Sequence, residues 1–451
     1  MNPPAQIIHI GGEKTVTGSC HLVKAHGLNI MVDCGIAQGS ETVKDIREWP
    51  VSPSELDYLF LTHAHIDHIG RIPQLIEHGF SGEILCTHPT KALLSPMLRD
   101  AMALSGSAPD NNKKILKIID ELSWGFEYCR DFKLKKGIGF RFGRSGHILG
   151  SCFIRFEIPH NKPGTATNPF SIIFSGDLGK RDTPILPDPD PPPACDLLIL
   201  ESTYGDRLHE DRSDRIGRLG RILEKALADH GKVYIPAFAL GRTQELLFEL
   251  DRIFSRNNRH NQKRSVPVFV DSPLGLEITR IYSTLSEFWD DESNRLLSKN
   301  DHPFDFAGLY SVDRAKDHHR LCGIPGPAII IAGSGMCTGG RIIEHLRQGL
   351  GDSRNDIFFV GYQAKGTPGR DIIRYADRAN GYVILKGAIT PIKAKIHTLT
   401  GYSAHADQKG LINWVKSMPQ KPGRIKLVHG ESKPRKTLAA ELTRMGYSVD
   451  V

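Results

Sequence analysis

Long apolar runs are missing from this sequence, and that absence excludes several classes of protein. No stretch approaches the roughly 20 apolar residues of a membrane-spanning helix, so we expect no membrane partner. The first residues lack both a basic start and a long apolar core, so we see no secretory signal. The eight cysteines form no C-x-x-C pair. Several stand in apolar runs, which favours reduced, buried thiols and a cytoplasmic protein.

A strong excess of either charge is also absent. The net charge of +7 over 451 residues is modestly basic, which permits a polyanionic partner without identifying one. The length suits two or three domains, and a hydrophobic fraction of 39% is enough for sizeable cores.

One short segment, Thr62-His63-Ala64-His65-Ile66-Asp67-His68, is unusually rich in side chains that bind metals. It follows an apolar run at 58–61, which predicts a buried strand, and precedes a helical pattern at about 69–77. Imidazole nitrogens and carboxylate oxygens are ligands that Zn²⁺ accepts. The spacing allows His63 and His65 to face one metal while Asp67 and His68 face another. The alternative is a solvated polar turn, but such clustering of histidines is uncommon there.

Other polar residues stand where apolar runs end. Asp33 closes the run 30–32, and Asp177 follows the run 171–174. His147 lies between small residues, just before an apolar segment at 152–158. Taken singly, each of these is a common turn residue.

The pattern H-x-H-x-D-H at 63–68 resembles the signature of the metallo-β-lactamase superfamily. The resemblance implies that His147 and Asp177 are further metal ligands and that Asp33 supports the site from behind through hydrogen bonds. A first zinc ion would be held by His63, His65, His147 and Asp177. A second would be held by Asp67, His68, Asp177 and His429. We therefore expect two Zn²⁺ per chain, bridged by Asp177.

Three later segments narrow the resemblance to the β-CASP branch of nucleic-acid-processing nucleases. Residues 201–207 (ESTYGDR), 401–407 (GYSAHAD) and 425–431 (IKLVHGE) resemble its motifs A, B and C. The implied fold class is α/β, an αββα sandwich with an inserted α/β domain. We predict the first part of the sandwich domain over 1–206, the β-CASP domain over 207–395, and the C-terminal part of the sandwich domain over 396–451.

The inserted segment alternates helical patterns with short apolar runs, which indicates a parallel sheet. The predicted strands are 233–238, 266–270, 328–332, 356–360 and 382–385. By resemblance, this domain would cover the metal site. A glycine-rich turn at 333–341 suits phosphate binding through backbone N–H groups, with Ser334 and Arg341 as side-chain contacts, or it serves backbone geometry alone.

The expected function is zinc-dependent hydrolysis of phosphodiester bonds in single-stranded RNA, leaving 5′-phosphate and 3′-hydroxyl ends. Two zinc ions would activate water for in-line displacement at phosphorus. We assign the catalytic roles to Asp67, Glu201 and His405, with His405 as general acid and Glu201 orienting its imidazole.

Alternatives remain open on the sequence alone. A β-CASP nuclease that acts on DNA is the nearest. A non-catalytic RNA-binding subunit would have lost ligands, and no ligand is missing here. A di-iron redox protein would carry glutamate at the position of His65. The sequence leaves open endonuclease or exonuclease action, the RNA target and the oligomeric state, a homodimer included.

Overall fold

The protein folds as two compact units, one inserted into the other. The computed structural model describes residues 4–106, 108–160, 168–211, 214–258 and 266–451. The first unit contains the residues up to Leu208 together with His405–Val451, and the second contains His209–Ala404. No helix of the described residues is long and apolar enough to cross a membrane.

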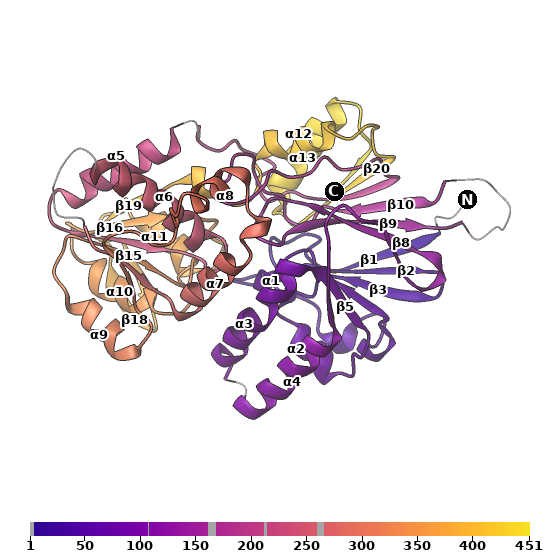
Figure 1. The fold of residues 1–451 in the computed structure, drawn as a ribbon, viewed down its shortest axis with the longest axis horizontal. Coiled ribbons are helices and arrows are strands. Elements are labelled where there is room, and N and C mark those ends of the chain that lie inside the picture. The colour runs from indigo at the N-terminus through magenta and orange to yellow at the C-terminus, as the bar shows by residue number, and fades with distance from the viewer. Residues whose placement is uncertain (1–3, 107, 161–167, 212–213, 259–265) are drawn as a thin grey trace. The chain divides into compact units, whose positions relative to one another are not determined.

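The first unit is built on two sheets (Figure 1). Over the described residues, the first sheet runs in the order β1 (Ala5–Gly11), β2 (Cys20–Ala25), β3 (Leu28–Val32), β4 (Tyr58–Phe60), β5 (Glu83–Thr87) and β6 (Ser123–Phe126). The second runs in the order β21 (Val449–Asp450), β20 (Arg424–Val428), β11 (Leu197–Glu201), β10 (Phe170–Phe174), β9 (Cys152–Ile158), β8 (Gly139–Arg144) and β7 (Phe132–Lys133).

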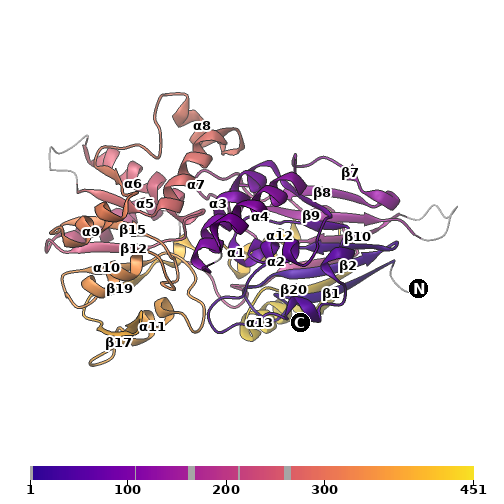
Figure 2. The same cartoon turned by 90° about the horizontal axis from the view of Figure 1, so that it is seen from below.

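The two sheets face each other across one apolar core, and helices cover their outer sides. Alternate residues of a strand point to opposite faces, so Ile172 and Phe174 enter the core between the sheets while Ile173 packs under the C-terminal helices. The helices of this unit are α1 (Ile66–Ile69), α2 (Ile72–Glu77), α3 (His88–Leu104), α4 (Pro109–Leu122), α12 (Gln408–Lys416) and α13 (Ser432–Arg444). Figure 1 shows α3 and α4 on one outer side of the sheets and α12 and α13 on the other, and Figure 2 views this unit from the side of α3 and α4. This arrangement confirms the predicted αββα sandwich.

The second unit is a parallel sheet with helices on both faces. Its strands, over the described residues, follow the order β14 (Leu309–Ser311), β13 (Val268–Asp271), β15 (Ala328–Ala332), β12 (Lys232–Pro236), β16 (Asp356–Phe359) and β19 (Lys395–Thr398). One face packs against α5 (Arg215–Leu227), α6 (Arg242–Asn258) and α7 (Pro273–Thr284). The other packs against α9 (Ala315–Gly323), α10 (Ile342–Gly349) and α11 (Pro368–Tyr375). The short helix α8 (Asp291–Leu297) follows α7.

Two details of this unit differ from the prediction. The segment at 382–385 is a strand, β17 (Tyr382–Leu385), but it pairs antiparallel with β18 (Ala388–Pro391) in a separate hairpin. The edge strands of the parallel sheet are instead β14 and β19, which were not predicted. Both are short and only partly buried, and neither contains a continuous apolar run. Because β19 pairs with β16, the chain returns to the first unit at His405 rather than near residue 396.

The sheets of the first unit bring several strand ends to one edge. β3 and β4 are parallel neighbours, and β10, β11 and β20 are parallel to one another. The carboxyl ends of parallel strands meet at the same edge, where α/β proteins commonly place their sites. Each of these strands is followed within a few residues by a side chain that the sequence analysis singled out: Asp33, His63, Asp177, Glu201 (the last residue of β11) and His429.

Candidate metal centre

The loop that carries His63 to His68 is fixed by its backbone. The carbonyl oxygen of Asp67 accepts from Ser19 N at 2.9 Å, and that of His68 accepts from Cys34 N at 2.7 Å. Gly35 permits this close approach, since a Cβ there would lie 1.5 Å from the Asp67 carbonyl oxygen. The loop is therefore held against the end of β3, and its side chains are presented from a rigid backbone.

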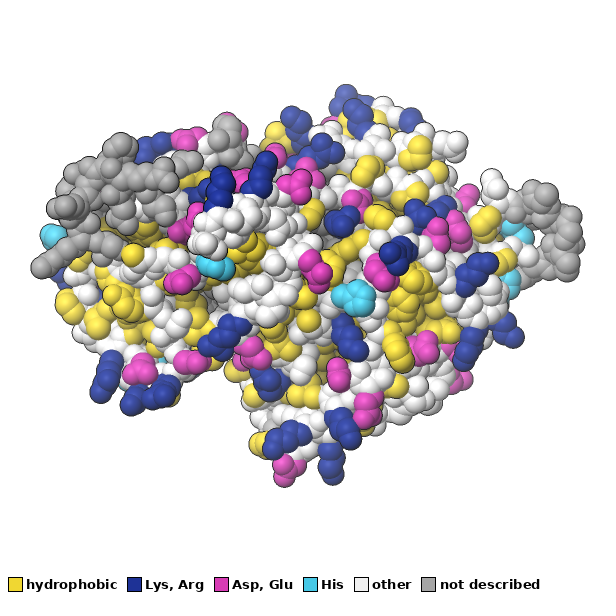
Figure 3. Space-filling model, in the orientation of Figure 1, with side chains coloured by type: hydrophobic (Ala, Val, Ile, Leu, Met, Phe, Trp, Pro, Cys, Tyr) yellow, Lys and Arg dark blue, Asp and Glu magenta, His cyan; other side chains and the backbone are white. Residues whose placement is uncertain are grey.

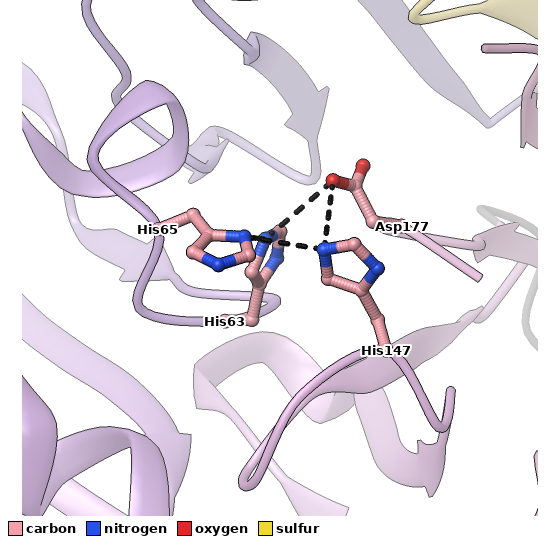
Figure 4. Close-up of side chains that lie close together, drawn as sticks. All are labelled: His63, His65, His147 and Asp177. Carbon is pink, nitrogen blue, oxygen red and sulfur yellow. Dashed lines mark hydrogen bonds and ion pairs between the residues drawn. The ribbon is translucent and has the colours of Figure 1, made fainter. Parts of the chain in front are cut away.

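A first group of four polar side chains converges from three separate segments (Figure 4). His65 Nδ1 lies 3.1 Å from both His63 Nε2 and His147 Nε2. Asp177 Oδ2 lies 3.5 Å from each of those Nε2 atoms. Three imidazoles and one carboxylate at such spacing form a donor set suited to tetrahedral zinc.

A second group of side chains also contacts Asp177. His68 Nε2 is 3.4 Å from Asp177 Oδ2, and His429 Nε2 is 3.5 Å from Asp177 Oδ1. Asp67 Oδ2 lies 3.8 Å from both Nε2 atoms. Asp177 thus faces both groups, as expected of a bridging carboxylate.

Several buried polar atoms of these residues have no hydrogen-bond partner in the described part of the chain, as expected where a cation binds. His68 Nε2, His429 Nε2 and Asp177 Oδ1 are all buried and have no hydrogen-bond partner among the described residues. A buried polar atom without a partner carries a large desolvation cost, and native structures rarely retain one. Three such atoms directed at one place indicate that a ligand completes the site.

The charges of the two groups differ in a way that also fits. Burial lowers the pKa of His63 and His147 well below the usual value, which leaves neutral imidazoles with a free lone pair. Burial acts in the same direction on His429, but Asp177 and Asp67 raise its pKa to about 9. The negative charges of Asp177 and Asp67 therefore stabilise a positive charge at this place, and either a proton on His429 or a metal ion can supply it.

The imidazoles are oriented by a surrounding layer of hydrogen bonds. Asp33 Oδ2 accepts from His68 Nδ1 at 2.7 Å, while Asp33 Oδ1 accepts from Thr62 N at 2.8 Å. Thr203 Oγ1 lies 3.1 Å from His429 Nδ1. Asp33 and His429 both have left-handed backbones, with φ of 58° and 51°, a strained state that persists at sites where the surroundings impose it. Thr62 and Thr203 were not singled out from the sequence, because threonine beside a strand end carries no distinctive signal.

His405 and Glu201 form a pair next to these groups. His405 Nδ1 lies 3.0 Å from Glu201 Oε1, and its Nε2 lies 3.8 Å from Asp177 Oδ2. Ala406 N donates to the Leu178 carbonyl at 2.7 Å, which holds the segment of His405 against the end of β10. The structure thus brings together, within the first unit, every metal and catalytic candidate derived from the sequence.

The two side chains suggested as phosphate contacts, Ser334 and Arg341, lie in the second unit and already make hydrogen bonds. Arg341 Nη1 donates to Asp271 Oδ1 at 2.7 Å and to the Val312 carbonyl at 2.8 Å. Ser334 Oγ accepts from Thr338 N at 2.9 Å, within its own loop. Both side chains therefore have structural roles, and a phosphate would have to compete with those partners.

Three family models match the chain. They are the metallo-beta-lactamase superfamily over 14–131, the Beta-Casp domain over 243–372, and the Zn-dependent metallo-hydrolase RNA specificity domain over 389–451. The matches lie in the order expected from the motifs, and the first contains Asp33 and the segment 63–68.

Similar proteins align over nearly the whole chain. Ribonuclease TTHA0252 of Thermus thermophilus is 35% identical over 449 residues, covering 99% of this chain and 98% of that protein. Transcription termination factor FttA of Methanocaldococcus jannaschii is 29% identical, covering 94% of this chain and 67% of that protein. Cleavage and polyadenylation specificity factor 73 of Drosophila melanogaster is 29% identical, covering 97% of this chain and 62% of that protein. A crystal structure of a protein of unknown function from Enterococcus faecalis shares the fold, with a TM-score of 0.56 at 13% identity over 99% of this chain and 97% of that one.

Proposed function

Because the chain belongs to the metallo-beta-lactamase superfamily and to its branch with a Beta-Casp domain, we propose that it is a zinc-dependent ribonuclease acting on single-stranded RNA. The observation that carries the proposal is the convergence of three imidazoles and Asp177 in one group and of Asp67, His68 and His429 beside it. The name and the full-length similarity of the Thermus relative supply the substrate class.

The proposal assigns two zinc ions to these groups. His63, His65, His147 and Asp177 would hold one, and Asp67, His68, Asp177 and His429 the other. When bound, the ions activate water near neutral pH and offset the negative charge that builds up at phosphorus. Asp33 holds the His68 ring so that its Nε2 points to the second group, which is the usual role of a carboxylate behind a histidine ligand.

The protein's own acid chemistry centres on His405. In the proposal its Nε2 carries the proton that the leaving 3′-oxygen takes up, and Glu201 accepts from Nδ1 and so fixes the ring. Burial disfavours the charged imidazole, but Glu201 and Asp177 together raise the pKa of His405 above its usual value. The residue is therefore equipped to hold a proton until the leaving group needs it. The products would carry 5′-phosphate and 3′-hydroxyl ends.

Two wider parts of the proposal concern the chain as a whole. The second unit would act as a cover for the metal site, as the β-CASP resemblance implies. A cytoplasmic location is favoured by the eight cysteines, all of which are free thiols. The face drawn in Figure 3 shows Lys and Arg side chains interspersed with Asp and Glu. This distribution fits an RNA whose phosphate backbone is contacted by several scattered basic side chains.

Digestion of end-labelled oligonucleotides tests the proposed function. Single-stranded RNAs with free, phosphorylated or triphosphorylated 5′ ends, and DNA of the same sequence, are incubated with the zinc-loaded protein. RNA should be cleaved and DNA spared, with new ends that a ligase requiring 5′-phosphate accepts. Ladders from internal cleavage, or mononucleotides released from one end, then distinguish endonuclease from exonuclease action. Cleavage of DNA alone, or of neither polymer, would overturn the proposal.

A further inference from the structure

The second unit contains a cluster of side chains that the proposed ribonuclease reaction does not use. Asp271 ends β13, His318 and Cys322 lie on α9, and His345 lies on α10. Asp271 and His345 are fully buried, His318 nearly so, and Cys322 is half-buried. His318 and Cys322 are four residues apart and therefore share one face of their helix. One ligand atom each from His318, Cys322 and His345 lie within 4.8 Å of one another.

The hydrogen bonds of Asp271 determine which ring nitrogens are free to bind. Asp271 Oδ2 accepts from His318 Nδ1 and from His345 Nε2, each at 2.6 Å. A neutral imidazole has one N–H, so the remaining nitrogen of each ring, His318 Nε2 and His345 Nδ1, carries a lone pair.

Both of those lone pairs face the same sulfur. Cys322 Sγ lies 3.9 Å from His318 Nε2 and 3.8 Å from His345 Nδ1. A thiol has one hydrogen and can satisfy one of the two acceptors at a time. Two acceptor nitrogens and one sulfur therefore lie close together, and the single thiol hydrogen always leaves one of the nitrogens without a donor from Cys322.

We propose that His318, Cys322 and His345 bind a zinc ion in the second unit, with Asp271 as the carboxylate that orients both histidines. With Zn–S near 2.3 Å and Zn–N near 2.0–2.1 Å, a tetrahedral ion holds sulfur and nitrogen about 3.6 Å apart. The observed separations exceed this by a few tenths of an ångström, which small side-chain rotations remove. A water molecule would fill the fourth position.

The surroundings of Asp271 support this assignment. Its other oxygen, Oδ1, accepts from Arg341 Nη1 at 2.7 Å, so both carboxylate oxygens of Asp271 are already engaged in hydrogen bonds. A carboxylate that fixes the tautomer and direction of a histidine is the usual partner behind a metal ligand. The ion would fasten α9 to α10 on one face of the parallel sheet, and so contribute to the stability of the second unit.

Cobalt substitution tests the proposal on the full chain, independently of nuclease activity. The proposed ligands of the catalytic ions are nitrogen and oxygen atoms only, so a thiolate-to-cobalt charge-transfer band cannot arise from that site. We expect the Co²⁺-loaded protein to show this band, and Cys322→Ser to abolish it and to bind one ion fewer per chain. Cys129→Ser, which removes an exposed thiol of the first unit, should leave both band and stoichiometry unchanged. Absence of the band in the wild type, or its persistence in Cys322→Ser, would overturn the proposal.

A second measurement needs no variant. Maleimide labelling followed by peptide mass spectrometry compares the chain with and without a chelator. Zinc should protect Cys322, and chelation should make it at least tenfold more reactive, whereas exposed Cys129 reacts equally in both states. Equal reactivity of Cys322 in the two states would contradict a zinc–thiolate bond. If zinc protects Cys322 from maleimide but the zinc-loaded protein does not cleave RNA, the result would count against the proposed function and not against this zinc site.

Discussion

The imidazole of His405 is held between two carboxylates, with Nδ1 3.0 Å from Glu201 Oε1 and Nε2 3.8 Å from Asp177 Oδ2. Glu201 is itself fixed, since Oε1 accepts from Leu178 N at 2.9 Å and Oε2 accepts from Thr203 N at 3.1 Å. The geometry gives His405 one nitrogen that is tied to a buried acid and one that faces the metal groups. The nitrogen that faces the metal groups, Nε2, is the one to which the proposal assigns the proton, while Glu201 fixes the ring through Nδ1.

The first prediction concerns His405 as general acid. His405→Ala should keep its zinc and lose about 10²–10⁴-fold in cleavage rate, the usual contribution of general acid catalysis. The loss should shrink on a nitrophenyl phosphodiester, because that leaving group needs no proton. Elemental analysis and initial rates on both substrates measure these effects.

Asp67→Ala provides the contrast. It removes a carboxylate that lies 3.8 Å from both His68 Nε2 and His429 Nε2, so both substrates should be affected alike. His78→Ala, which changes an exposed histidine of the same unit, should leave both rates unchanged. If His405→Ala loses zinc, or loses activity equally on both substrates, His405 is not the acid.

The second prediction concerns metal content. In the Cys322→Ser background, which lacks the proposed thiolate site, we expect close to two zinc ions per chain. Asp177→Ala should lower the count by more than one ion, because that carboxylate lies between both groups. Inductively coupled plasma mass spectrometry gives the stoichiometry. Full activity with at most one bound ion at saturation would contradict the two-metal assignment.

The third prediction concerns the carboxylate behind His68. Asp33→Asn removes the charge that orients His68 Nδ1, and such changes typically weaken metal affinity 10–100-fold. Competition with a zinc-sensitive dye measures the affinity. Asp57→Asn is the matched control, since Asp57 accepts a backbone N–H from Asn29 away from the metal groups. Equal affinities for the two variants would show that Asp33 has no part in holding the ligand.

The fourth prediction concerns pH and the second unit. Burial raises the pKa of Glu249 to about 7, although Arg215 and Tyr402 act in the opposite direction. The folded state therefore holds this proton more tightly than the unfolded chain, whose pKa is near 4.5. The stabilisation is complete below pH 4.5 and is lost as the pH rises through 7, amounting to a difference on the order of 3 kcal/mol.

Hydrogen exchange in α6 measures this effect, because Glu249 lies on that helix. The protection of wild type relative to Glu249→Gln should fall between pH 4.5 and 7 and stay level above that range. A difference that does not change with pH would mean that Arg215 keeps Glu249 ionised throughout.

The fifth prediction concerns the second unit as a cover. RNA that carries photoreactive 4-thiouridine should cross-link to peptides of both units when it is bound to a cleavage-deficient His405→Ala chain. Peptide mass spectrometry identifies the attachment sites. Cross-links confined to peptides of the first unit would contradict the prediction that the second unit covers the metal site.

The sequence predicts the first unit well because its polar residues stand at the ends of apolar runs. Asp33, Asp177 and His429 each follow a buried strand. Asp177 and His429 follow β10 and β20, which lie on either side of β11 in one sheet, and Asp33 follows β3 in the facing sheet, so the three side chains meet only once the two sheets have packed. The second unit is harder, since β14 and β19 are short and only partly buried and leave no apolar run to detect. His345 stands 23 residues after Cys322, and only the packing of α10 beside α9 brings them together. The spacing of His318 and Cys322 was the available signal, but two residues on a helix are too common to identify a site.

The pairing of β11 with β20 has a consequence for the chain during its synthesis. His429 follows β20, and β20 reaches the sheet only after the whole insertion has been made. Until then the β11 side of the second sheet is an unpaired edge of buried apolar residues, a template for aggregation. A ribosome-bound chain that ends before Arg424 therefore cannot complete the ligand set. The second group of metal-binding side chains is therefore complete only after His429 has been added to the growing chain.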